Sequence, residues 1–457
     1  MKIQHLLFFL ILFSCSKDAM DSEPDQITDP PEEVLAFEVT TNSIQIPTSQ
    51  VSPEDISRTF YDVSGTFVFG NDQTMFAYYP GVADWSSGNS IDNVNPVASQ
   101  VLIKEDDTWN FFKTDYNLES WGMRNFERRG DEIIIGDGNE IGPNFSEWKG
   151  DVYIGKLFNN GDINWRKINT PNEQGFFHGT CAGDLNNDGL TDVGVTPGIS
   201  HAGINLFLQN QDGSFTRKDE LLNFNGFTPF TLDFADLIGD GIDEIITADY
   251  GGGTAPTGEE HEIRIYKFNA SEEEFQLHFQ INEPYIYDWG LGATSIKIHD
   301  FTNDGILDIA VAREDLDYGG FEVWKGTGNA EFEYVFSSPT WTQNELQFRE
   351  FSVFDANSDG FLDILLRPFH YGNLYRNADN CWWNVTACNG IKLNHLIWLN
   401  NGDGTFDYYK DKDLTIEGIN VDNIHPYLQQ QKLHFVGTFS DNSTQPFINT
   451  IDIKVNF

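Results

Sequence analysis

The sequence predicts an all-β fold, a seven-bladed β-propeller. Two observations carry this prediction: a nine-residue acidic loop that starts at residues 184, 236, 300 and 355, and the short apolar strands around each copy. The steps of 52, 64 and 55 residues between copies are typical of propellers, in which each repeat forms one blade. About 400 residues at roughly 57 per blade give seven blades, within the usual four to eight.

The acidic loops carry oxygen-bearing side chains at positions 1, 5 and 9 and glycine at position 6. Glycine accommodates the tight turn, and oxygens at this spacing suit a hard cation such as Ca²⁺, with position 3 adding a side chain and position 7 its backbone carbonyl. The predicted ligands are Asp184, Asn186, Asp188, Leu190 and Asp192; Asp236, Asp240, Ile242 and Glu244; Asp300, Thr302, Asp304, Ile306 and Asp308; and Asp355, Asn357, Asp359, Phe361 and Asp363.

The loops differ in how complete the ligand set is. The first and fourth are complete, the third has Thr302 at position 3, and the second has Ile238 there and is expected to bind most weakly. An EF-hand needs glutamate at position 12 and flanking helices, whereas position 12 lies in a predicted strand in all four loops. We expect two to four structural Ca²⁺ ions, because a closed cage of protein oxygens leaves no open position for chemistry.

Four strands are expected in each blade, in a fixed order around the loop. A strand such as 295–299 precedes the loop, an apolar strand such as 309–312 follows it, and two further strands close the unit. Blades without the loop are predicted at 66–104, 129–155 and 434–454. The last of these needs an N-terminal strand, expected near Thr59–Val63, to close the ring without an open edge.

The pattern Phe-x-x-x-Asp-x-Asn-x-Asp-Gly-x-x-Asp-Ile, followed by Gly-x-x-Val/Leu, resembles the FG-GAP/VCBS repeats of integrin-α-like β-propellers. The resemblance covers roughly residues 60 to 457 of the expected propeller, residues 55–457, with clear copies only from 176 to 410. It implies that each acidic loop joins the first and second strands of a blade and binds Ca²⁺.

The N-terminus has the pattern of a lipoprotein signal peptide, residues 1–15. A charged Lys2 precedes the apolar run Leu6–Phe13, which is too short to span a bilayer. Leu12-Phe13-Ser14-Cys15 resembles the bacterial lipobox, in which Cys15 is lipidated; an ordinary secretory signal is the alternative. Residues 16–54 predict a flexible acidic, Pro-rich tether, whose first acids resemble the surface-export tags of Bacteroidetes lipoproteins. The expected location is the bacterial outer membrane, lipid-anchored and periplasmic or surface-exposed.

The net charge limits the classes of partner, and the cysteines indicate where a disulfide can form. The net charge is −44, so nucleic acid is excluded, and we expect a monomer that meets the membrane only through its lipid anchor. Cys381 and Cys388 lie seven residues apart in a Trp- and Asn-rich insertion and are predicted to form a disulfide. Cys181 is expected to be a buried free thiol.

A ligand face is predicted opposite the acidic loops, because successive strands alternate in direction. Aromatic and polar residues in the connections at that end suit a glycan or a surface protein, and hence adhesion or carbohydrate binding. The alternative is that these aromatics only pack the connections against one another. The residues are Tyr285, Trp289, Tyr318, Trp341, Arg367, His370, Tyr371, Trp382 and Trp383.

Two other functions remain open at this point. A polysaccharide lyase would use residues such as His178, His201, His370, Tyr371 and Arg367 to move protons and bind a uronate, but no spacing supports it beyond residue type. A structural or assembly protein would need no small ligand. No catalytic motif occurs in the sequence, so no catalytic residue is assigned.

Removing Ca²⁺ should lower the melting temperature if the loops are structural metal sites. We expect Asp188→Ala and Asp359→Ala each to lower it more than Asp240→Ala, because the second loop lacks a ligand at position 3. Thermal unfolding with and without a chelator measures the effect, and equal melting temperatures would refute the structural role.

Overall fold

The computed structural model describes residues 36–46, 65–81, 83, 95–123, 125–138, 150–197, 203–222, 229–249, 263–281, 292–314, 318–339, 341–342, 348–368, 390–410, 412, 414–417, 421–439 and 447–457. All of them belong to one structural unit, Ala36–Phe457. The predicted signal peptide with Cys15, and the Cys381–Cys388 disulfide, lie outside these residues. Within the described ranges, no helix has the length and hydrophobicity needed to cross a membrane.

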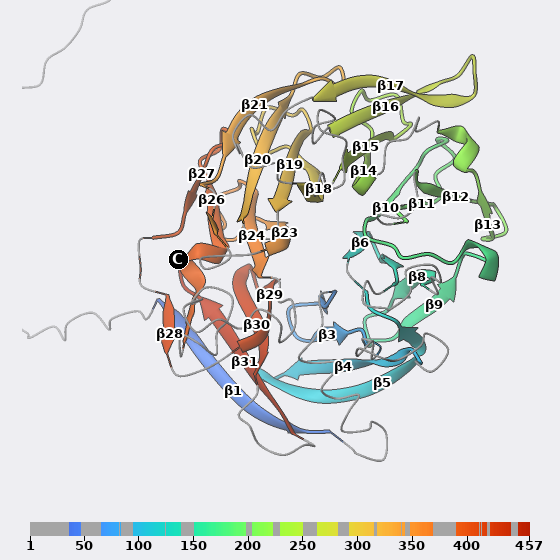
Figure 1. The fold of residues 1–457 in the computed structure, drawn as a ribbon. Coiled ribbons are helices and arrows are strands. Elements are labelled where there is room, and N and C mark those ends of the chain that lie inside the picture. Colours follow the sequence, from blue (N-terminus) through green and yellow to red (C-terminus); the bar gives the residue numbers. More distant parts are fainter. Residues whose placement is uncertain are drawn as a thin grey trace, which may run out of the picture. The chain divides into compact units, whose positions relative to one another are not determined.

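Seven antiparallel sheets form the blades, six with four strands and one with a short fifth strand, which confirms the predicted fold (Figure 1). Blades 1 to 3 are β2 (Phe67–Gly70), β3 (Met75–Tyr79), β4 (Val97–Glu105) and β5 (Thr108–Ser120); β6 (Asn125–Arg129), β7 (Glu132–Gly136), β8 (Val152–Leu157) and β9 (Ile163–Lys167); and β10 (Thr180–Gly183), β11 (Asp192–Val195), β12 (Asn205–Gln209) and β13 (Phe215–Arg217). Blades 4 and 5 are β14 (Pro229–Ala235), β15 (Glu244–Asp249), β16 (Ile263–Asn269) and β17 (Glu274–Ile281); and β18 (Gly292–His299), β19 (Asp308–Glu314), β20 (Tyr318–Gly326) and β21 (Phe332–Ser337), with β22 (Trp341–Thr342) beside β20.

The last two blades contain the departures from simple chain order. Blade 6 is β23 (Phe348–Phe354), β24 (Asp363–Pro368), β26 (Ile397–Asn400) and β27 (Phe406–Tyr408), beside a separate pair, β25 (Gly390–Lys392) and β28 (Thr415–Glu417). Blade 7 is β29 (Val421–Gln429), β30 (Lys432–Phe439), β31 (Phe447–Val455) and β1 (Phe37–Gln45). Short 3-10 helices complete the described elements: η2 (Pro171–Glu173), η3 (Asp219–Leu221) and η5 (Leu393–Leu396).

The apolar core lies between neighbouring blades, because both faces of a sheet must be covered. Leu206 of blade 3 packs in one buried cluster with Leu232 of blade 4, and similar clusters join each later pair of blades. Val436 of blade 7 and Leu102 of blade 1 share another cluster. Since blades 1, 2 and 3 are joined in the same way, the ring closes.

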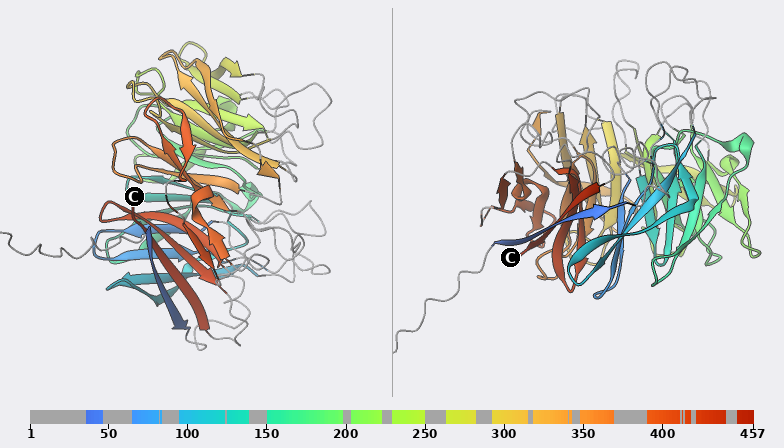
Figure 2. Two further views of the ribbon diagram at one scale, coloured as in Figure 1. Left: turned by 90° about the vertical axis from the view of Figure 1, so that its left-hand side faces the viewer. Right: turned by 90° about the horizontal axis from the view of Figure 1, so that it is seen from below.

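The ring is closed by β1, which pairs with β31 from Phe37 opposite Val455 to Gln45 opposite Phe447 (Figure 2). An N-terminal closing strand was predicted, but its position was wrong: residues 37–45 make the pairing, and residues 59–63 lie outside the described part of the chain. The strand also lies within the predicted tether. The polar composition of this segment led to its prediction as a tether. The alternation of Phe37 and Val39 with hydrophilic neighbours is nevertheless the local signal of a strand.

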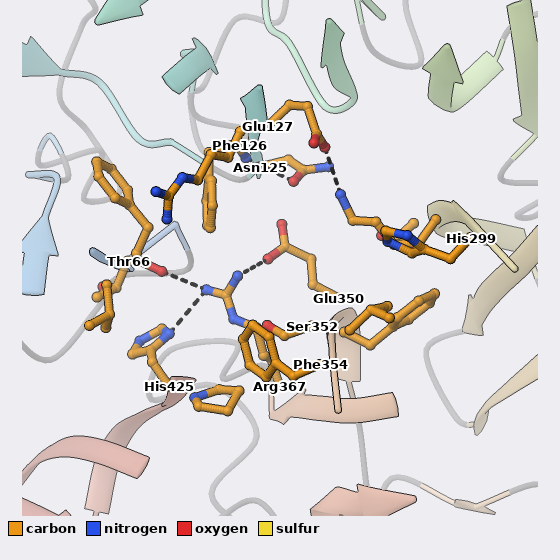
Figure 3. A pocket seen from close by; sticks show the side chains of 18 residues that line it. Thr66, Asn125, Phe126, Glu127, His299, Glu350, Ser352, Phe354, Arg367 and His425 are labelled. Carbon is orange, nitrogen blue, oxygen red and sulfur yellow. Dashed lines mark hydrogen bonds and ion pairs between the residues drawn. The ribbon is translucent and has the colours of Figure 1, made fainter. Parts of the chain in front are cut away.

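The first strand of each blade lies innermost, and several of these strands surround a central cavity of about 270 Å³ (Figure 3). Its lining comes from β2, β6, β18, β23, β24 and β29, so blades 1, 2, 5, 6 and 7 contribute to it. The cavity therefore depends on ring closure, which brings strands from both ends of the chain together.

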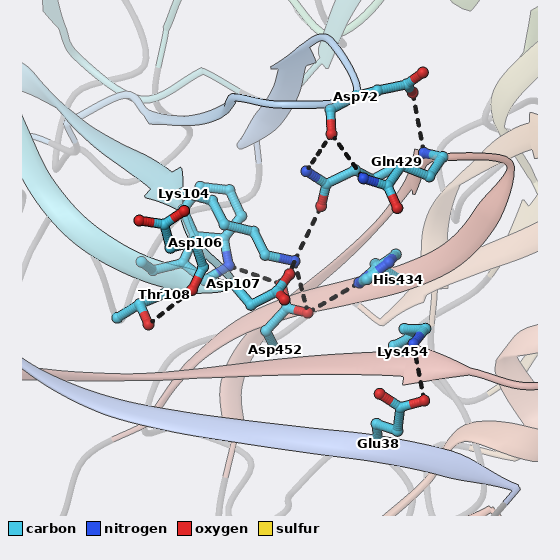
Figure 4. A network of polar contacts seen from close by, with 12 residues as sticks. Glu38, Asp72, Lys104, Asp106, Asp107, Thr108, Gln429, His434, Asp452 and Lys454 are labelled. Atoms are coloured by element: carbon cyan, nitrogen blue, oxygen red, sulfur yellow. Dashed lines mark hydrogen bonds and ion pairs between the residues drawn. The ribbon is translucent and has the colours of Figure 1, made fainter. Parts of the chain in front are cut away.

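A buried polar network joins blade 7 to blade 1 (Figure 4). Lys104 Nζ lies 3.2 Å from Asp452 Oδ1 and donates to the Tyr427 hydroxyl at 3.1 Å. Asp452 also accepts from Trp109 Nε1 at 2.8 Å and pairs with His434 Nδ1 at 3.0 Å. Burial alone would raise the pKa of Asp452, but His434 and Lys104 hold it below its ordinary value.

Removing the carboxylate of Asp452 should weaken this seam strongly. Asp452→Ala leaves Lys104, 2% exposed, without its buried counterion, because the remaining carboxylate, Asp107, is exposed and 3.8 Å away; we expect a loss of about 3–5 kcal/mol. Lys454→Ala is the matched control on the same strand, because it removes a more exposed ion pair with Glu38 and should cost less than about 1 kcal/mol. Urea denaturation measures both; equal losses would contradict the role of the network.

Candidate functional site

All four acidic loops join the first strand of a blade to the second, in blades 3 to 6. Blades 1, 2 and 7 make the same connection through short turns at 71–74, 130–131 and 430–431. Strands flank every acidic loop, so an EF-hand arrangement is excluded. By strand alternation, these seven connections lie at one end of the ring.

The first loop shows how its side chains shape the backbone. Asp184 Oδ1 accepts from the backbone N–H of Asp188 at 3.1 Å, and Asp184 Oδ2 accepts from Gly189 at 2.8 Å. Asp188 Oδ1 in turn accepts from Leu190 at 2.9 Å. Equivalent bonds form in the other three loops. The carboxylates at positions 1 and 5 therefore fix the turn.

Glycine at position 6 is required by its positive φ in all four loops, and lack of space adds to the requirement only at Gly241, where an added Cβ would lie 2.7 Å from Asn187 Nδ2. Gly189, for example, has a φ of 80°, yet a Cβ added there would have no heavy atom within 4 Å. Position 4 also has a positive φ in all four loops, 56° at Asn187 and 63° at Ser358, a feature that the sequence motif did not reveal. These two residues turn the chain tightly enough to bring the acidic side chains together.

The carboxylate at position 9 is buried and ties the loop to its own blade. Asp192 Oδ2 accepts from the N–H of Leu185 and Oδ1 from that of Gln209 at the end of β12, both at 2.9 Å. Asp363 makes the same pair of contacts in blade 6, and Asp308 in blade 5 accepts from Thr302, one position later in the loop, and from Gly326 at the end of β20. The carboxylate at position 9 thus has a structural role that the sequence did not predict. The sequence indicated only that this residue could be a metal ligand.

Burial leaves these carboxylates with unusually high pKa values. It raises the pKa of Asp192 to about 6 and the pKa values of Glu244 and Asp363 to about 7, with the loop's own acids adding to the rise. The pKa of Asp308 is raised for the same reason. Negative charge at position 9 is therefore poorly compensated, and a nearby cation would stabilise it.

The third loop contains a cation from the protein itself. Lys325 Nζ lies 2.6 Å from Asp304 Oδ2, and this contact lowers the pKa of Asp304. Among the described residues, no set of three or more Asp, Glu, His or Cys side chains converges on a metal position. The donors are nevertheless all oxygens, and a carboxylate oxygen that accepts one N–H keeps a second lone pair, so the chemistry of the loops fits Ca²⁺.

Two ion pairs lie in the central cavity. Lys297 of β18 pairs with Glu127 of β6 at 2.7 Å and so links blade 5 to blade 2 across the ring. Arg367 of β24 pairs with Glu350 at 2.6 Å and also donates to the Thr66 carbonyl at 3.0 Å, which links blade 6 to blade 1. Burial alone would lower the pKa of Lys297, but Glu127 and Asp233 hold it above its ordinary value.

Comparison with known proteins identifies the repeats. The profile described as "FG-GAP-like repeat" matches residues 184–247 and 258–366, which contain all four acidic loops. The chain contains FG-GAP-like repeats. No curated protein matches it.

Two solved structures are similar in shape to this FG-GAP-like propeller. A protein from Bacteroides fragilis described as a candidate 6-phosphogluconolactonase is 12% identical, with a TM-score of 0.43, over 78% of this chain and 84% of the other. Sqt1 from Saccharomyces cerevisiae is 11% identical, with a TM-score of 0.42, over 87% of this chain and 100% of the other.

Most of the predicted ligand face lies outside the described residues: Tyr285, Trp289, His370, Tyr371, Trp382 and Trp383. Tyr318 begins β20 and Trp341 begins β22. The prediction for Arg367 was wrong, because this residue was expected on an exposed connection. It lies in β24, is 7% exposed, and is turned towards Glu350 and His425 (Figure 3).

The groups suggested for a lyase do not form an exposed set in the described part of the chain. His178 is 3% exposed, with its ring centroid 4.4 Å from that of Phe176 and 4.1 Å from that of Phe230. Arg367 is held in its ion pair, and His201, His370 and Tyr371 fall outside the described residues. Cys181 is a buried free thiol, as predicted.

The cavity residues were missed from the sequence, although a signal exists. In β18, Ser295, Lys297 and His299 alternate with Ile296 and Ile298, so polar side chains occupy one face of an innermost strand. That alternation usually marks a solvent-exposed face. Only the closed ring turns such faces towards one another.

Without metal, the FG-GAP-like repeats should make stability rise as the pH falls. The folded-state pKa values of Asp363 and Glu244, about 7, lie above the ordinary carboxyl values, so the folded protein takes up protons first. From about pH 8 to about pH 5.5, each such group should add about 2 kcal/mol to the free energy of unfolding. Urea denaturation in chelator measures this.

Asp363→Asn should remove its share of the pH dependence, whereas Asp403→Asn, an exposed control in the same blade, should not. Saturating Ca²⁺ should also suppress the rise, because a bound cation favours the charged carboxylates. A metal-free protein whose stability falls steadily over this range would contradict the prediction.

Proposed function

We propose that this protein is a binding propeller of the cell envelope. Ca²⁺ bound by its FG-GAP-like repeats stabilises the ring, and a glycan or a surface protein binds at the end of the ring opposite the acidic loops. The fold fits a binding or structural role, since a closed ring of rigid blades holds many connections in fixed relative positions.

One observation supports the proposal: the aromatic-rich segments connect to strand ends that lie opposite the acidic loops. Residues 369–389, with Trp382 and Trp383, follow β24, whose other end meets the fourth acidic loop. Residues 282–291, with Tyr285 and Trp289, lead from β17 into β18, and the acidic loop follows the far end of β18. Aromatic side chains offer flat apolar surface to sugars and dominate protein interfaces.

Calcium supports this scaffold by acting on the carboxylates described above. The first and fourth loops offer Asp184, Asn186 and Asp188, or Asp355, Asn357 and Asp359, with a poorly compensated buried carboxylate at position 9. The third loop already has Lys325 on Asp304, and the second lacks a donor at position 3. We therefore propose that the first and fourth loops bind Ca²⁺ most tightly, as structural ions.

The proposed location is the outer membrane, with Cys15 as the lipid-bearing residue. The apolar run before Cys15 and the acidic stretch after it support this proposal. With a net charge of −44, the protein would be repelled by an anionic membrane surface, so a lipid anchor would be its membrane contact.

Binding should depend on the aromatic residues at the proposed face. We expect Trp289→Ala combined with Trp382→Ala to weaken binding to a glycan or envelope protein by about tenfold or more. Tyr334→Ala is the control, because Tyr334 is 48% exposed and lies in β21, an outer strand of blade 5. A glycan array and an envelope-protein pull-down identify the ligand. Absence of binding in both, or equal effects of all substitutions, would favour a purely structural protein.

A further inference from the structure

Two buried polar atoms of the central cavity lack a hydrogen-bond partner among the described residues: Thr66 Oγ1 and His425 Nε2. Thr66 is 1% exposed and His425 is 5% exposed, so bulk water does not compensate either group. Leaving a buried polar group unsatisfied is unfavourable, and such groups in native proteins usually bind water or a ligand. Both residues come from innermost strands or their starts, in blades 1 and 7.

The hydrogen-bonding state of His425 follows from its neighbour. Arg367 Nη2 lies 3.0 Å from His425 Nδ1, and a guanidinium only donates, so Nδ1 must accept. Burial and the nearby Arg367 lower the pKa of His425 well below its ordinary value. The imidazole is therefore neutral with its proton on Nε2, and the unpartnered atom is an N–H donor.

The buried charges lining the cavity are paired: Lys297 with Glu127 at 2.7 Å, and Arg367 with Glu350 at 2.6 Å. Arg128 also lines the cavity, but its side chain is exposed and donates from Nε to the Gly130 carbonyl at 3.1 Å. An anion inside the cavity would have to displace a carboxylate from Lys297 or Arg367, and a cation would have to displace one of these two side chains. A neutral molecule can instead use the remaining lone pairs and N–H groups of both pairs.

Apolar surface also lines the cavity. Phe67, Phe126, Phe351 and Phe354 contribute to the wall, and the Arg367 guanidinium lies 5.6 Å from the centroid of the Phe126 ring. Aromatic rings beside paired donors and acceptors suit a molecule with apolar C–H faces and hydroxyl groups at its edges. At about 270 Å³, the space is below the roughly 300–1,000 Å³ of sites for drug-sized ligands, so it suits one small ring.

We propose that the central cavity binds a small, neutral, polyhydroxylated molecule of the size of a monosaccharide. One of its hydroxyl oxygens accepts from His425 Nε2–H, and a second hydroxyl bonds Thr66 Oγ1. The ion pairs Glu127–Lys297 and Glu350–Arg367 supply acceptors and donors for the others. This site is separate from the proposed loop face and does not depend on it.

The test measures binding of glucose, galactose and N-acetylglucosamine to the purified full chain by saturation-transfer NMR and calorimetry, with glucuronate and inorganic phosphate as charged probes. We expect at least one neutral sugar to bind. Thr66→Val should weaken it about fivefold to tenfold, His425→Phe at least as much, and Thr66→Ser, which keeps the hydroxyl, should restore it.

Thr247→Val is the matched control, because Thr247 also buries an unpartnered hydroxyl but lies in β15, away from the cavity lining. It should leave sugar binding unchanged. The proposal is overturned if no neutral sugar binds, if only the charged probes bind, or if Thr66→Val and Thr247→Val weaken binding equally. Loss of sugar binding in Trp289→Ala with retention in Thr66→Val would place the sugar at the loop face and also overturn it.

Discussion

The pairing of β1 with β31 is the contact on which this propeller depends. It joins the start of the described chain to its end, and it covers the strand edge that blade 7 would otherwise expose. Beside it, Lys104 and Asp452 form a buried ion pair whose other partners are Tyr427, Trp109 and His434. A buried pair of this kind adds little net stability, but it fixes which surfaces meet, because any other register would leave a charge unpaired. The cavity walls come from strands on both sides of this seam, so their positions depend on it.

The seven blades differ in the structural features that they carry. Blades 3 to 6 carry the acidic loops, which are the part with the clear repeat. Blades 1 and 7 lack the loop and instead carry the seam between the two ends of the chain, and blade 2 supplies Glu127 to the cavity. Divergence of these three blades is understandable in physical terms: a seam and a cavity need particular side chains at single positions, whereas a loop that shapes its own turn can be repeated.

Acidic groups at the seam and in the cavity are stabilised differently from those in the acidic loops. At the seam and in the cavity, carboxylates are paired with Lys104, Lys297 and Arg367. In the loops, backbone N–H groups satisfy most of them, and among the described residues two loop acids have a protein cation beside them: Asp304, next to Lys325, and Asp243, 3.8 Å from Arg129. Burial raises the pKa values at position 9, and the hydrogen bonds from backbone amides offset only part of this rise, so a metal ion is the natural complement.

Features that depend on neighbouring residues were predicted correctly from the sequence: strand order within a blade, the turn at Gly189 and its equivalents, the number of blades, and the position of the acidic loops between first and second strands. The closing strand was misplaced, Arg367 was expected on an exposed connection, and the cavity was missed. These three features depend on residues far apart in the chain, so they follow only from the folded ring. Glu127 meets Lys297 across 170 positions, and Lys104 meets Asp452 across 348. A local pattern shows that one face of a strand is polar, but whether that face meets solvent or another blade is decided only when the ring closes.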